Sequence, residues 1–142
     1  MKTIWFILRD HRDELWRRWA ASLDERIALD YRELLASALG ERIVRTFVED
    51  LVSIAEAEEY EAPHMLRDVE QRVANETEYR HTIGFSSLDM VIAWQALRAA
   101  IIDVLIDALV RGEAPSFTDS LMQLKRCDAL IDRMVCATMT AE

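Results

Sequence analysis

The stretch Arg80-His-Thr-Ile-Gly-Phe-Ser-Ser-Leu-Asp-Met-Val91 interrupts a chain that is otherwise rich in helical patterns, and it therefore decides how the helices are divided. Gly84 can adopt the left-handed backbone conformation that ends a helix. Ser86 is followed three residues later by Asp89, which is the spacing of a capping box at the start of the next helix. The helix dipole also favours an acidic residue in a first turn. The stretch predicts a structural turn built from Gly84, Ser86 and Asp89.

Working outward from this turn, apolar residues recur at helical spacing on both sides, and no segment alternates with a period of two. Isolated glycines at 40, 84 and 112 supply expected helix ends, and Pro115 blocks continuation after the third. Asp24, Pro63 and the pair Ser116 and Asp119 supply expected helix starts. The predicted helices span about 3–22, 25–39, 41–60, 63–82, 87–111 and 116–140. We therefore predict an all-α bundle of six helices.

Length and charge limit the classes of protein to which the chain can belong. Its 142 residues, of which 51% are hydrophobic, suit one domain, 1–142, with one core. The formal net charge of -9 disfavours binding to nucleic acid or to an anionic membrane surface. The most apolar window, 101–110, carries Asp103 and Asp107, so we expect no membrane insertion.

The cysteines and the start of the chain indicate a compartment. Cys127 and Cys136 lie nine residues apart in one predicted helix, on roughly opposite faces, and cannot form a disulfide with each other. The apolar run Ile4–Leu8 is too short for the core of a signal peptide. We expect a cytoplasmic protein.

Two Glu-x-x-His patterns, Glu61-Ala-Pro-His64 and Glu78-Tyr-Arg-His81, have the spacing that di-iron bundles use for two ligands on one helix face. Both lie on one predicted helix, at its two ends, so they cannot face each other, and we expect no metal site. A globin-type haem site needs only one helical histidine over an apolar pocket, so His64 or His81 would be the ligand if haem were bound. His11, the third histidine, lies in a charged segment. The simpler interpretation is that all three are polar surface or helix-end residues, and we expect no cofactor.

Catalytic patterns are also missing from the sequence. The three glycines are isolated, so no phosphate-binding loop is present. Ser86 and Ser87 are explained by capping, and both cysteines lie in an ordinary amphipathic helix without a neighbouring base. We therefore predict a protein that is not an enzyme.

The predicted helix 87–111 is nearly apolar on all sides, which is typical of a helix that is central or shared between subunits. Gln95 and Arg98 are polar groups on this helix and need a partner within the subunit, across an interface or on a ligand. The candidate interface and signalling residues are Trp94, Gln95, Arg98 and Ile102.

Several of these residues resemble a known family. Arg80, the turn Gly84-Phe-Ser86, Leu88 and the run Leu97-Arg-Ala-Ala-Ile101 are similar to the N-terminal domain of the stressosome RsbR and RsbRD proteins, which are co-antagonists of the switch kinase RsbT. Trp19 and the stretch 30–39 also resemble the start of that domain. The resemblance implies a globin-like all-α domain without haem, which forms a homodimer and is the sensory half of a signalling protein. Members usually continue into a STAS domain or a kinase core, whereas this chain stops at Glu142, so we expect either a stand-alone regulator or a truncated sensor module.

The expected function is a non-enzymatic dimeric sensor or regulatory domain of a bacterial stress-response protein, which passes a change in packing to an output partner. One alternative is a haem- or tetrapyrrole-binding globin-like sensor. A second alternative is a metal-binding helical-bundle enzyme. The stimulus, the output partner and the direction of regulation stay open.

Overall fold

The structure is a computed structural model that describes residues 3–114 and 116–141. Within this part of the chain the fold is all-α, as predicted, with seven helices and no strand. The helices are α1 (Ile4–Asp10), α2 (Arg12–Ser22), α3 (Leu29–Leu35), α4 (Ala38–Glu56), α5 (Ala62–Thr82), α6 (Ser87–Val110) and α7 (Phe117–Thr140). The predicted number of six helices is therefore wrong.

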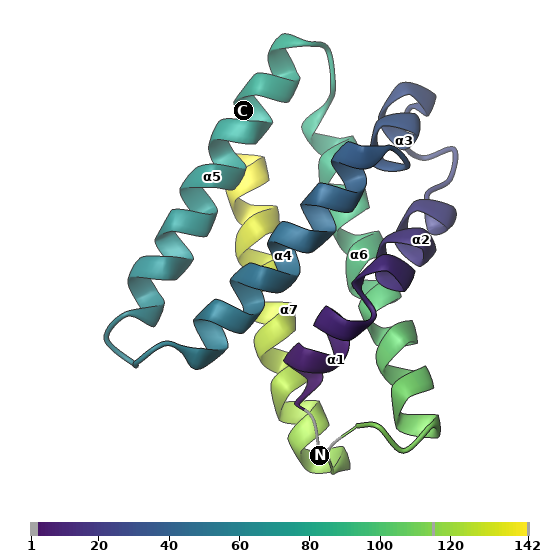
Figure 1. Ribbon diagram of the computed structural model, residues 1–142. Coiled ribbons are helices and arrows are strands. Elements are labelled where there is room, and N and C mark those ends of the chain that lie inside the picture. Colours follow the sequence, from purple (N-terminus) through teal and green to yellow (C-terminus); the bar gives the residue numbers. More distant parts are fainter. Residues whose placement is uncertain (1–2, 115, 142) are drawn as a thin grey trace.

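The helices pack around one continuous apolar core (Figure 1). Helix α4 crosses in front of α6 and α7, and α5 packs against both α4 and α7. Helices α1 and α2 each contact α4 and α6, while α3 contacts α4. Helix α7 completes the core with a buried face that packs on α5 and α6 and includes Cys127, Ile131 and Met134. No helix in the described part of the chain is long and apolar enough to span a membrane.

The predicted first helix, 3–22, is divided into α1 and α2 at His11. The backbone angles of His11, φ −111° and ψ 23°, lie outside the helical range, although its amide still donates to the carbonyl of Ile7 at 3.0 Å. The change of direction lets Leu8 on one side and Trp19 on the other reach the same core, and both are fully buried. No glycine or proline marks this break, so the apolar pattern alone merged the two helices.

The predicted helix 25–39, with Gly40 as its stop, is also corrected. Helix α3 is shorter, and Gly40 lies inside the first turns of α4, after Ser37, whose hydroxyl accepts from the amide of Leu39 at 3.3 Å. A Cβ atom at Gly40 would lie only 1.6 Å from the carbonyl oxygen of Leu35. Gly40 is therefore needed for the close approach of α3 and α4.

The other predicted helices lie near the observed ones. The predicted 41–60 corresponds to α4, which begins earlier and ends at Glu56, because the acidic segment that follows is exposed and forms a turn. The predicted 63–82, 87–111 and 116–140 correspond to α5, α6 and α7 within one residue at each end. Pro115 lies outside the described residues.

The turn between α5 and α6 is a Schellman motif. Gly84 has φ +99°, and its amide donates to the carbonyl of His81 at 3.1 Å. The amide of Phe85 donates to the carbonyl of Arg80 at 3.0 Å, which is the second bond of the motif. This geometry ends α5 at Thr82, so Arg80 lies in the last turn of the helix.

Ser86 and Asp89 form the start of α6. The hydroxyl of Ser86 accepts from the amide of Asp89 at 3.2 Å. The carboxylate of Asp89 accepts from the amide of Ala28 at 3.2 Å, so it joins the start of α6 to the segment before α3.

Candidate functional site

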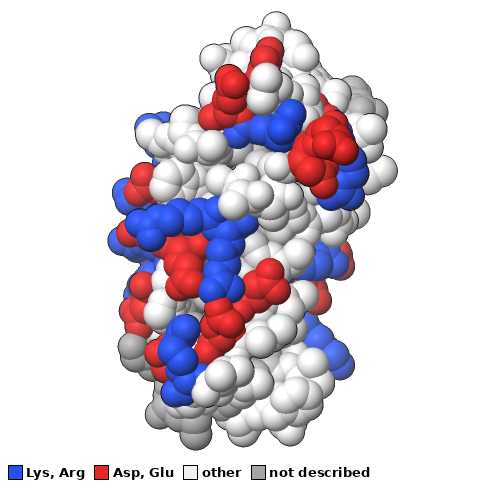
Figure 2. Space-filling model, turned by 90° about the vertical axis from the view of Figure 1, so that its right-hand side faces the viewer, with Lys and Arg blue, Asp and Glu red and all other residues white. Residues whose placement is uncertain are grey.

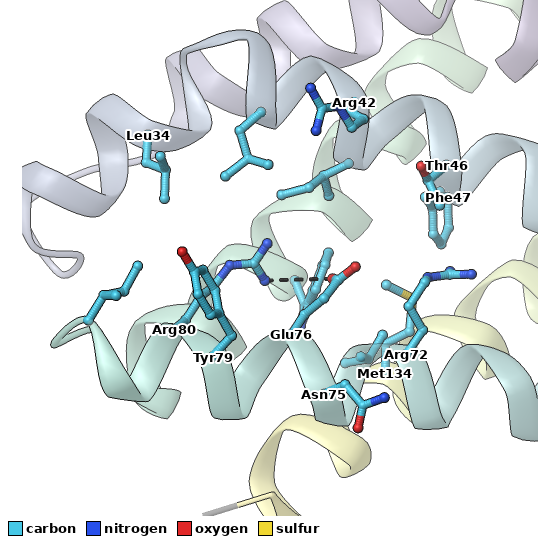
Figure 3. A pocket seen from close by; sticks show the side chains of 15 residues that line it. Leu34, Arg42, Thr46, Phe47, Arg72, Asn75, Glu76, Tyr79, Arg80 and Met134 are labelled. Atoms are coloured by element: carbon cyan, nitrogen blue, oxygen red, sulfur yellow. Dashed lines mark ion pairs between the residues drawn. The ribbon is translucent and has the colours of Figure 1, made fainter.

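A cavity of about 600 Å³ lies between α4 and α5, and we call it the α4–α5 cavity (Figure 3). Most of its wall is apolar. Apolar side chains come from α3, α4, α5 and the residue that follows it, α6 and α7, namely Leu34, Leu39, Ile43, Phe47, Val73, Ile83, Trp94 and Met134. A volume of this size is typical of small-molecule sites.

Arg80 contributes a cation to the α4–α5 cavity. It lies on the buried face of α5 with Val69, Val73 and Thr77, and only 6% of the residue is exposed. Figure 3 shows its guanidinium group reaching from α5 toward α4. Among the described residues its one ionic contact is with Glu76, where Nη1 and Oε2 are 3.8 Å apart, which is too long for a hydrogen bond. No nitrogen of Arg80 is among the fully buried polar atoms that lack a hydrogen-bond partner, so this guanidinium group has only a long ionic contact and stays open to the cavity.

Other charged side chains around the cavity leave it slightly positive. Arg72 forms an ion pair with Asp50 and is neutralised by it, and Figure 3 shows its guanidinium pointing away from Arg80. Burial raises the pKa of Asp50, and Arg72 opposes that shift. Arg42 and Arg80 then stand against the single lining carboxylate, Glu76. The α4–α5 cavity is thus cationic in a chain whose net charge is -9.

Arg80 is a site residue that the sequence alone does not mark as one. The segment 67–80 is rich in polar residues, but Val69 and Val73 place an apolar stripe on it, and Arg80 continues this stripe eleven residues after Val69. An arginine at the end of an apolar stripe was the signal that could have identified it.

Trp94, a predicted signalling residue, is a core residue at the inner wall of the cavity. Its indole is 4% exposed and is stacked with that of Trp19 at a centroid distance of 6.4 Å. Its Nε1 donates to Oγ1 of Thr138 on α7 at 3.1 Å. The indole of Trp19 in turn donates to the carbonyl of Ala93 at 2.8 Å. Trp94 therefore joins α2, α6 and α7.

The three other predicted residues on α6 point in different directions. Gln95 is exposed. Arg98 pairs with α7 through Asp132 at 2.5 Å and Asp128 at 3.8 Å, so its partners lie within the subunit. Ile102 is half-buried at the edge of an apolar groove. The structure does not bring these four residues together in one site.

The groove beside Ile102 belongs to a larger exposed surface at the end of α6 and the start of α7, which we call the α6–α7 apolar face. Its members are Ile102, Ile106, Leu109, Val110, Phe117 and Leu121. Val110 is 82% exposed and Phe117 is 70% exposed. The groove itself encloses only about 130 Å³ and its wall is almost entirely apolar. It is too small for most ligands but suits protruding side chains of another protein.

Figure 2 shows how charge is distributed on the side of the molecule that lies at the right in Figure 1. Positive and negative side chains form mixed clusters on this side. The lower end of this view is mostly uncharged. No surface of one sign dominates this side.

The three histidines line neither the α4–α5 cavity nor the groove beside Ile102. His64 is exposed and lies 3.8 Å from Asp68. His81 has its Nε2 2.6 Å from the hydroxyl of Ser87, and His11 has its Nε2 3.2 Å from Glu113. In residues 3–114 and 116–141, no group of three or more His, Cys, Asp or Glu side chains is arranged to hold a metal ion.

Comparison with known proteins does not add a family. No family model matches the chain, and neither curated proteins nor solved structures gave a significant match. The resemblance to RsbR-type domains therefore stays a prediction.

Proposed function

We propose that the chain is a non-enzymatic sensory or regulatory domain that acts as a homodimer and passes a change in packing to an output partner. The observation that carries this proposal is the α6–α7 apolar face. Large apolar patches are uncommon on monomeric soluble proteins and mark interaction surfaces. We place the dimer interface on this face.

A second copy of the chain is a suitable partner for this face because the face carries both a groove and exposed apolar side chains. It has protruding side chains, Val110 and Phe117, beside the apolar groove. Two copies related by a two-fold axis could each place protruding side chains on the groove of the other, as an isologous interface requires.

Helix α6 supplies a route for the signal in this proposal. Its outer side carries Ile106 and Val110 of the apolar face, and its inner side carries Trp94 and Leu97 in the core. A packed helix moves as a unit, so a change around Trp94 would shift the outer side chains as well. The interface would then favour one of two packings, and a partner that binds them unequally would detect the difference.

The test is the molar mass in solution, measured by size-exclusion chromatography with light scattering and full-spectrum absorbance on the same peak. We expect a colourless dimer. Phe117→Glu should give a folded monomer, because a carboxylate buried in an apolar interface costs several kcal/mol and the two-fold axis introduces it twice.

Leu29→Glu is the matched control, because Leu29 is an exposed leucine on α3, outside the α6–α7 apolar face. This variant should remain a dimer. A monomeric unmodified protein, or a dimer that persists in Phe117→Glu, would refute the proposed interface. A Soret absorption band would instead favour the haem-binding alternative.

A further inference from the structure

We propose that the α4–α5 cavity binds a small amphipathic carboxylate, whose acid group pairs with Arg80 while its apolar part fills the space between α4 and α5. The inference does not depend on the oligomeric state.

The first step of the argument concerns the charge of Arg80. A guanidinium group cannot lose its charge by giving up a proton at physiological pH. Its side chain is 8% exposed, and its only ionic partner among the described residues is Glu76 at 3.8 Å. Buried charges in proteins are normally paired and hydrogen-bonded. An anion bound in the cavity would therefore give this group a closer partner than Glu76 does.

The second step concerns the shape of that anion. Arginine can donate two parallel hydrogen bonds, so it favours an anion with two neighbouring oxygens, such as a carboxylate or a phosphate. The cavity around it, with a volume of about 600 Å³, is far larger than a simple inorganic ion requires. Its wall is dominated by side chains such as Leu39, Ile43, Phe47 and Ile83, which favour an apolar body.

The third step concerns the other polar groups at the cavity. Arg42 adds a second positive charge on the α4 side, whereas Arg72 is already paired with Asp50. Glu76 is the only carboxylate among the lining residues. It competes with a bound anion for Arg80 and, because its side chain is 42% exposed, it can turn toward solvent when the anion binds.

The alternative is that Arg80 has a purely structural role. In that case its replacement would destabilise the fold, and the protein would gain nothing from an added anion. If Arg80 is instead a binding residue, its replacement should leave the fold equally stable or more stable, because an unfavourable buried charge is removed. An added anion should then stabilise the unmodified protein. Stability and binding together therefore separate the two roles.

The experiment is isothermal titration calorimetry of the full chain with decanoate, together with decyltrimethylammonium as a probe of equal chain length and opposite charge. Decanoate should bind and decyltrimethylammonium should not. Arg80→Met keeps the apolar stem and should weaken decanoate binding by about tenfold or more, since it removes charge-assisted hydrogen bonds. Arg45→Met is the matched control, because Arg45 lies exposed on α4 and does not line the cavity. It should bind decanoate like the unmodified protein.

Two further variants keep the test decisive if Arg80→Met fails to fold. Glu76→Gln should bind decanoate more tightly, because the competing carboxylate is gone. Thr46→Trp should fill the cavity from α4 and abolish binding. The Tm of the unmodified protein should rise with decanoate, whereas the Tm of Arg80→Met should be at least as high without ligand and should not respond to it.

Several results would overturn the proposal. These are no binding of decanoate by the unmodified protein, equal binding by Arg80→Met, or weaker binding by Glu76→Gln. Equally tight binding of decyltrimethylammonium would show that charge plays no part. Binding of inorganic phosphate that displaces decanoate at equal concentration would show a simple anion site without an apolar requirement.

Discussion

Among single residues, Tyr31 and Cys127 show how burial changes chemistry without any special partner. Tyr31 is 2% exposed, its ring packs on that of Phe85 at 5.0 Å, and burial raises its pKa to about 12, against the opposing charge of Arg80. Burial likewise raises the pKa of Cys127 to about 12. Both groups are neutral in the folded protein at ordinary pH.

A pH dependence of stability follows from these two groups. Each has a pKa that is higher in the folded state than its ordinary value, which is 10.0 for Tyr31 and 9.0 for Cys127. The unfolded chain therefore loses these protons first as the pH rises. We expect the free energy of unfolding to be unaffected by these groups below pH 9.0 and to fall between there and about pH 12, with a slope of up to about 1.4 kcal/mol per pH unit for each group.

Urea unfolding at a series of alkaline pH values measures this effect. Tyr31→Phe should reduce the slope above pH 10.0, and Cys136→Ser should not change it, because Cys136 is exposed. A stability curve that is flat up to pH 12, or one that is equally steep in Tyr31→Phe, would contradict the assignment.

Arg80 is the residue for which the sequence was least informative. Its charge suggested a place in solvent, and only the packing of α5 against α4 and α7 shows that the end of the stripe from Val69 is buried. Whether one polar side chain is buried depends on how the helices pack together. The sequence could therefore predict the position of Arg80 along the helix but not its environment.

At the level of helices, the sequence predicted best those boundaries that local chemistry fixes. Gly84 and Ser86 act through hydrogen bonds to residues at most five positions away, and α5 and α6 end and begin within one residue of the predicted limits. The break at His11 has no such local cause, because it results from the fit of two apolar faces to one core. The exposed end of α6 was not predictable either, because an apolar pattern does not show which side of a helix lacks a neighbour.

The junction of α3 and α4 gives a prediction on helix packing. Replacement of glycine by alanine within a helix usually stabilises it by about 0.5–1 kcal/mol. Gly40→Ala should do the reverse and destabilise the fold by about 1–3 kcal/mol, because the new methyl group would overlap the carbonyl of Leu35 and force the two helices apart. Equilibrium unfolding in urea measures the change.

Ser53→Ala, at an exposed position of the same helix, is the control and should leave stability unchanged or slightly raised. A stabilised Gly40→Ala would mean that α3 and α4 do not approach as closely as described.

Gly84→Val should destabilise the fold by about 1 kcal/mol or more for a different reason. The φ of +99° at Gly84 is strained for any residue with a side chain, although no atom lies near the position of the added Cβ.

For the whole molecule, α6 links the two proposed sites. Trp94 lines the α4–α5 cavity, and Ile106 lies three turns further along the same helix on the α6–α7 apolar face. If a ligand at the cavity changes dimer affinity, thermodynamic linkage requires dimer formation to change ligand affinity by the same factor. The proposed dimer interface and the proposed carboxylate site do not depend on each other. Any coupling between them can be measured either from the dimer affinity or from the ligand affinity.

We predict that decanoate changes the dimer dissociation constant by about fivefold or more, which is the lower end of typical allosteric coupling. Sedimentation equilibrium with and without decanoate gives that factor, and calorimetry on Phe117→Glu, the expected monomer, gives the affinity change for the ligand. Arg80→Met should show no effect of decanoate on dimerisation. Equal dimer affinities with and without a ligand that does bind would remove α6 as the route of the signal.

The place of α7 in the core has a consequence for the synthesis of the protein. Its buried face, with Cys127, Ile131 and Met134, covers apolar surface on α5 and α6, which are made earlier. At about 5–20 residues per second, a ribosome needs about one to five seconds to add the 24 residues of α7. Until α7 is available, Trp94 on α6 lacks its hydrogen-bond partner Thr138, and α6 lacks the cover that α7 provides. Folding of this domain is therefore expected to be completed after translation of α7 and not helix by helix as the chain emerges.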